Sequence, residues 1–134
     1  MLAIRKPALG WVGGEGAFGN DPDAVMQKYL YLGIYPMAPF PANDHSLAPS
    51  ARMDQLYLDY GPLLDAMRGK KWVLAPHAVE VKDAAAKANL FEVPGGYVCP
   101  VVLGGGAKTV EVALRNLKNL SGKIVVEVLH PGED

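Results

Sequence analysis

The most constraining feature of this sequence is a change of hydrophobic period near Gly69. Before it, apolar residues recur every three to four positions, as in amphipathic helices; after it, they alternate with polar residues, as in strands. The chain also holds 15 glycines and 11 prolines, so it turns often. These patterns predict an α+β chain. A helical and proline-rich segment over 1–69 precedes an antiparallel β-sheet or partial β-sandwich over 70–134.

Two helices are expected in the first segment. Asp21 followed by Pro22 is typical of an N-cap and a first helical position, and predicts a helix over about 22–32. Ser50 is a candidate N-cap for a second helical pattern. Within that pattern, Gly61-Pro62 predicts a kink or two abutting short helices.

The second segment alternates with a period of two. A turn at 94–96 predicts a hairpin between its middle runs. A sheet of this size buries little core alone, so we expect it to pack on the preceding helices or to continue in a longer parent chain. The strands are expected at 71–75, 78–81, 89–93, 97–103, 110–114 and 124–128.

Composition excludes several classes of protein. The formal net charge is -1, which gives no reason to expect nucleic acid or a membrane as a partner. The single cysteine, Cys99, excludes an internal disulfide and multi-cysteine metal sites. No apolar run has the roughly 20 residues of a membrane helix, and the N-terminus does not resemble a signal peptide. The localisation stays open: the chain is either cytoplasmic or a piece of an exported protein.

Residues 14–19, Gly-Glu-Gly-Ala-Phe-Gly, match the pattern of a dinucleotide-binding loop. Small residues there would let backbone N–H groups approach a phosphate at a helix N-terminus. The sequence shows no clear hydrophobic strand before the loop and no parallel strand after the following helix. We therefore expect a surface loop, with phosphate or nucleotide binding as the alternative.

The candidate contact residues are Asn43, Asp44 and His45, followed by Ser46. Asp44 beside His45 could perform acid–base chemistry or bind sugar hydroxyls. Asn and Asp also cap ordinary turns by bonding their own backbone, so this interpretation stays open beside the functional one. The chain contains no complete catalytic motif, and the spacing of its three histidines matches no metal motif, so we expect no metal and no cofactor.

Three stretches together resemble the C-terminal region of α-galactosidase-like glycoside hydrolases: Gly-Ile-Tyr-Pro at 33–36, Tyr-Gly-Pro-Leu-Leu at 60–64 and Gly-Lys-Lys-Trp at 69–72. In that family the end of a (β/α)₈ barrel is followed by an antiparallel β-sandwich. The resemblance implies a non-catalytic segment that braces a barrel or contacts sugar, since the family's catalytic carboxylates lie on earlier strands. The alternative is a stand-alone module that binds an unknown ligand or self-associates.

Overall fold

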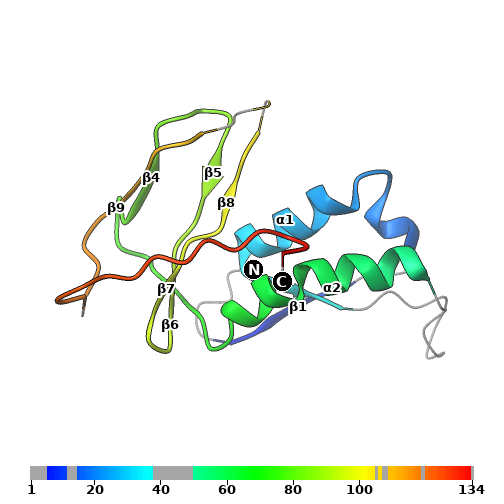
Figure 1. Cartoon of the computed structure of the whole chain (residues 1–134), viewed down its shortest axis with the longest axis horizontal. Coiled ribbons are helices and arrows are strands. Elements are labelled where there is room, and N and C mark those ends of the chain that lie inside the picture. Colours follow the sequence, from blue (N-terminus) through cyan, green and yellow to red (C-terminus); the bar gives the residue numbers. More distant parts are fainter. Residues whose placement is uncertain are drawn as a thin grey trace.

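The computed structural model describes residues 6–11, 15–37, 50–104, 106, 109–118 and 120–133. These residues form helices in the first half of the chain and mostly antiparallel strands in the second (Figure 1). The expected α+β class is therefore confirmed.

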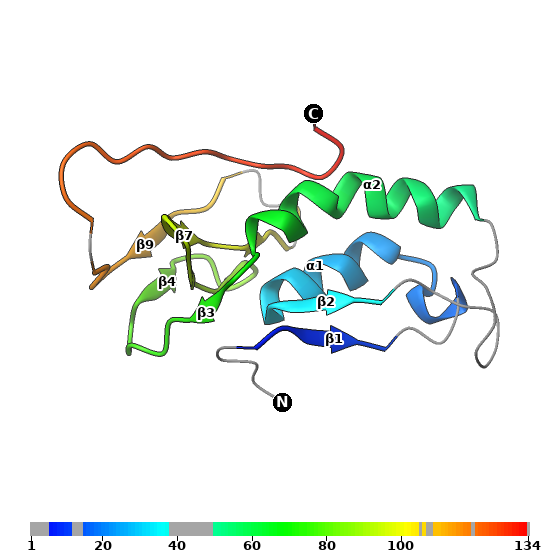
Figure 2. The same ribbon diagram turned by 90° about the horizontal axis from the view of Figure 1, so that it is seen from below.

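The first half contains a parallel strand pair connected through a helix. β1 (Ala8–Gly10) leads through the 3₁₀ helix η1 (Glu15–Phe18) into α1 (Pro22–Leu32), and β2 (Ile34–Pro36) then lies parallel beside β1 (Figure 2). The expectation that no strand precedes the glycine-rich loop and that no parallel strand follows the helix is therefore wrong. Each strand has only three residues, too few to show a period in the sequence.

The bounds of α1 match the prediction, and its capping groups explain them. The Asp21 carboxylate accepts a hydrogen bond from the Ala24 N–H at 3.0 Å, and Pro22 occupies the first turn. Gly33 ends the helix in the left-handed conformation at φ 66°, and its N–H donates to the Leu30 carbonyl at 3.0 Å. The left-handed Gly33 turns the chain directly into β2.

α2 (Ala51–Ala66) also begins at its predicted cap, where Ser50 Oγ accepts a hydrogen bond from the Met53 N–H at 3.4 Å. It is one continuous helix with Pro62 inside it, so the alternative of two abutting helices is wrong. Pro62 lies on the exposed side of the helix, where its ring meets solvent rather than the core.

The two helices pack on each other and form most of the core. Tyr60 of α2 is fully buried, and its hydroxyl donates to the Asp23 carboxylate of α1 at 2.9 Å. Residues from the second half join the same core, as the small size of the sheet predicted. The buried cluster consists of Phe18, Met26, Leu30, Met53, Leu56, Tyr60, Met67 and Phe91, with Trp72 and Val98 among the half-buried residues packed against it.

The described residues of the second half form three small antiparallel sheets. The predicted hairpin is confirmed, because β6 and β7 pair with Val93 opposite Gly96. β3 adds to the other side of β6, β4 pairs with β9, and β5 pairs with β8. The bounds are β3 (Lys71–Trp72), β4 (Val79–Val81), β5 (Lys87–Ala88), β6 (Phe91–Val93), β7 (Gly96–Val98), β8 (Val101–Val102) and β9 (Val112–Leu114).

The strand expected at 124–128 does not form. The segment is extended but pairs with no strand among the described residues, and every residue from 121 to 130 is exposed. An alternating pattern gives a strand only when a neighbouring strand supplies the hydrogen bonds. This segment therefore has the composition of a strand without a partner.

Candidate functional site

The three predicted contact residues, Asn43, Asp44 and His45, lie outside the described residues. In the sequence they stand between β2 and α2. The structure does describe the ends of β1 and β2, the two strands that precede the glycine-rich loop and the Asn43–His45 segment. These strand ends define the candidate site.

The carboxyl ends of β1 and β2 lie at one edge, because the strands are parallel and in register. The Met37 N–H donates to the Gly10 carbonyl at 2.9 Å and continues the pairing past β2. Trp11 follows β1 at this edge, with 69% of its surface exposed. Ligands of parallel α/β folds bind at the carboxyl ends of the strands, which makes this edge the candidate site.

Trp11 was not predicted as a site residue, because it stands just before the glycine-rich run 14–19, which was expected to be only a surface loop. Its exposed indole offers a broad apolar face, which can stack against an apolar face of a ligand. A signal was present in the sequence: a tryptophan directly before a glycine-rich run. Only the position of β1 shows that this tryptophan ends a parallel strand.

Tyr57 of α2 supports the same edge from the core side. Its hydroxyl donates to the Met37 carbonyl at 2.6 Å, and burial, with a smaller effect of nearby Tyr29, raises the pKa of Tyr57 to about 12. A tyrosine in this state is a fixed neutral donor near neutral pH. It holds the backbone at the carboxyl end of β2 and stays un-ionised there.

The glycine-rich loop is only partly described, since Gly14 lies outside the described residues. The strand–loop–helix–strand order that phosphate binding requires is present, contrary to expectation. However, the N-terminus of α1 is already capped by the Asp21 carboxylate, which places a negative charge where a phosphate would sit. The geometry therefore favours a structural role for this loop.

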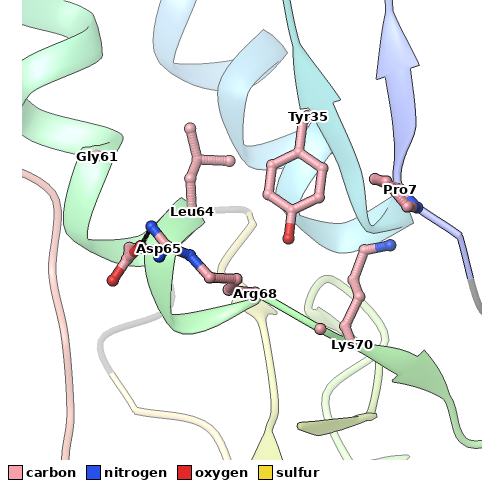
Figure 3. Close-up of a pocket in the computed structure, with 8 residues that line it drawn as sticks. Pro7, Tyr35, Gly61, Leu64, Asp65, Arg68 and Lys70 are labelled. Atoms are coloured by element: carbon pink, nitrogen blue, oxygen red, sulfur yellow. Dashed lines mark hydrogen bonds and ion pairs between the residues drawn. The ribbon is translucent and has the colours of Figure 1, made fainter. Parts of the chain in front are cut away.

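A pocket of about 440 Å³ lies at the opposite, amino-terminal end of the parallel strands (Figure 3). In Figure 3 Tyr35 of β2 stands between Leu64 of α2 and Lys70. The Tyr35 hydroxyl donates to the Met67 carbonyl at 2.7 Å and so holds the end of α2 against β2. The lining is Pro7, Tyr35, Gly61, Leu64, Asp65, Arg68, Gly69 and Lys70.

Lys70 is unusual because it is only 4% exposed and its Nζ has no hydrogen-bond partner in the described part of the chain. The ammonium lies 5.5 Å from the centre of the Tyr35 ring and 5.7 Å from that of Phe91. These two rings offset part of the cost of removing the charge from water. Burial lowers the pKa of Lys70 from its ordinary value of 10.5.

We expect Lys70→Met to raise the free energy of unfolding by about 1 kcal/mol at neutral pH, because an unpaired buried charge costs more than two ring contacts return. The lowered pKa of Lys70 also makes the free energy of unfolding of the wild type depend on pH. The unfolded chain binds more protons between the folded-state pKa and 10.5, so stability rises with pH across that window. Urea titrations at several pH values should show this slope in wild type and not in Lys70→Met.

The matched control is Lys71→Met, at the exposed neighbouring position. We expect it to change stability by less than about 0.5 kcal/mol. If Lys70→Met instead lowered the free energy of unfolding by more than about 1 kcal/mol, the ammonium would stabilise the fold. Its attraction to the two rings would then exceed the cost of burying it.

Other polar clusters of the described residues are surface ion pairs. Glu80 contacts Arg115 and His77, and these two neighbours, Arg115 first, lower the pKa of Glu80. Lys82 pairs with Glu111 at 2.5 Å. A general acid needs a raised pKa, so Glu80 does not fit that role. These pairs lie on exposed side chains and connect β4 with the segment around β9.

No group of three or more potential metal ligands occurs among the described residues. His77 and His130 are both exposed, and His45 lies outside the described part. Cys99 is a free, half-buried thiol whose pKa is raised by burial, as expected for a small apolar residue rather than a nucleophile. In the same part of the chain, neither helix is long and apolar enough to cross a membrane.

We compared the chain with models of protein families, with curated proteins and with solved structures, and none of them matched.

Proposed function

We propose that this chain is a non-catalytic C-terminal segment of a glycoside-hydrolase-like, carbohydrate-active protein. Its first half supplies strands and helices to a barrel wall, and its antiparallel strands brace that wall. The observation that carries the proposal is the order β1–α1–β2–α2 with β1 and β2 parallel. This order makes two consecutive strand–helix units, the repeating element of a (β/α)₈ barrel.

The parallel pair is incomplete as a sheet. Parallel sheets are normally covered on both faces and contain more than two strands. The Cα of Gly10 faces α1, because a Cβ there would lie 2.4 Å from Cε1 of Tyr29. Leu9 therefore points to the other face, where 67% of its surface is exposed. In a closed barrel this face is the interior one, and the inward side chains of the other strands would cover it.

The second half supports the same proposal. The antiparallel strands follow α2 directly and share its core through Phe91 and Trp72. This succession of strand–helix units and antiparallel sheet is the one that the resemblance to α-galactosidase-like enzymes implies. In this role Trp11 lies at the sugar-facing end of the strands, and carbohydrate is the expected ligand. Asn43, Asp44 and His45, which follow β2 in the sequence, stay the candidate contact residues.

The proposal predicts that the purified chain does not hydrolyse aryl α- or β-glycosides above a buffer blank. The family's catalytic carboxylates would be contributed by earlier strands, so the chemistry lies outside this segment. Clear turnover that co-purifies with the chain and is lost on unfolding would contradict the proposal.

A further inference from the structure

We propose that residues 123–129, which we call the free strand, pair with a second copy of this chain. The first five of them, 123–127, lie antiparallel to the same five residues of the other copy. The two-fold axis passes beside Val125. This inference does not depend on the barrel proposal, because it uses a different segment and a different observation.

The free strand is an extended segment that pairs with no strand among the described residues. Four of its seven residues are β-branched, the type that favours strands. Its side chains are open to solvent: Val125 is 82% exposed, Val126 80% and Val128 67%. Figures 1 and 2 show it as an extended segment that runs along the outside of the molecule toward α2. Exposed extended segments of this composition pair readily with another strand.

The chain just after the free strand is attached to α2, which limits the conformations that the free strand can adopt. The Gly132 N–H donates to the Asp59 carbonyl of α2 at 3.1 Å. Val125 and its neighbours lie several residues before this attachment and pair with no strand of the described chain. A tethered extended segment loses less conformational entropy on pairing than a free tail.

The charges of the free strand select both the partner and the register. In a symmetric antiparallel pair, Lys123 of one copy can face Glu127 of the other, and the symmetry creates this pair twice. Ile124 then faces Val126, and Val125 faces its own counterpart. A shift of the register by two residues removes both ion pairs, so the sequence is complementary to itself in one arrangement.

Charge reversal tests this arrangement. At low ionic strength, sedimentation velocity over a concentration series should show a monomer–dimer equilibrium for the wild type. Lys123→Glu or Glu127→Lys alone places like charges opposite each other twice. Each should weaken the dimer roughly tenfold or more. The double variant should restore it, and an equimolar mixture of the two single variants should form a heterodimer.

The controls are Lys28→Glu on α1 and Glu133→Lys beyond the free strand, which make the same charge changes at exposed positions. Both should dimerise like wild type, and circular dichroism should show that all variants fold. A wild-type chain that stays monomeric at about 1 mM would overturn the proposal. Single reversals without effect, or a double variant that does not recover, would overturn it equally.

Discussion

Gly33→Ala is expected to lower the free energy of unfolding by about 2–4 kcal/mol, the sum of backbone strain and a steric clash. Gly33 has φ 66°, a conformation that residues with a Cβ rarely adopt. A Cβ at this position would lie 2.7 Å from Cζ of Phe91 and 2.9 Å from Cε of Lys70. The residue joins α1 to β2 beside the buried Phe91 ring, so neither neighbour can move without disturbing the core.

Gly19→Ala is the matched control for this substitution. Gly19 has φ 61°, but a Cβ there would meet nothing within 4 Å. Gly19→Ala should therefore lower the free energy of unfolding by the backbone strain alone, about 1 kcal/mol. Urea titrations followed by circular dichroism measure both variants. Equal losses would show that the contact between Gly33, Phe91 and Lys70 does not constrain the fold.

Phe91→Ala is expected to cost about 3–5 kcal/mol, the usual range for a buried aromatic residue. Phe91 is 1% exposed and belongs to β6, yet it joins the cluster formed by the helices. Its ring lies 6.2 Å from that of Trp72 and covers Gly33 and the Lys70 ammonium. The substitution therefore removes a buried aromatic contact between the two halves of the chain.

Leu58→Ala provides the comparison, because Leu58 on α2 is 69% exposed. This variant should lower the free energy of unfolding by less than about 0.5 kcal/mol. The combination with Gly33→Ala adds a second check. Without the Phe91 ring, a Cβ at position 33 loses its closest steric clash. The double variant should therefore be less destabilised than the sum of the two single variants. A Phe91→Ala loss below about 1 kcal/mol would contradict the packing of Phe91 between the helices and the sheet.

The elements that the sequence predicts well are those decided by local groups. Asp21 and Ser50 fix the starts of both helices through their own side chains, and the turn after Val93 fixes the hairpin. These signals involve residues within a few positions of each other. They are visible in the sequence because no distant contact is needed to produce them.

The elements that the sequence misses depend on distant neighbours. β1 and β2 pair across 26 positions, from Ala8 to Ile34, and each is too short to show alternation. The segment 124–128 shows alternation but has no neighbouring strand in the described chain. A period predicts which residues could form a strand, whereas pairing decides whether they do.

The candidate site residues also fall into those visible in the sequence and those that depend on distant contacts. A polar cluster such as Asn43, Asp44 and His45 is visible as a pattern, and its role stays a prediction. Trp11 becomes a candidate only through the position of β1, and Lys70 only through the rings of Tyr35 and Phe91. The buried lysine had no signal in the sequence, because Gly69-Lys70-Lys71 resembles an ordinary basic helix end.

If β1–α1–β2–α2 is part of a barrel wall, the catalytic residues lie on strands encoded elsewhere in the same gene. The most direct measurement is to sequence the DNA on both sides of the segment that encodes this chain. We expect an open reading frame that continues upstream into further strand–helix units with paired carboxylates at the strand ends. In-frame stop codons close to both ends would contradict the barrel proposal, because a stand-alone chain would then have to cover the open face of β1 by another means.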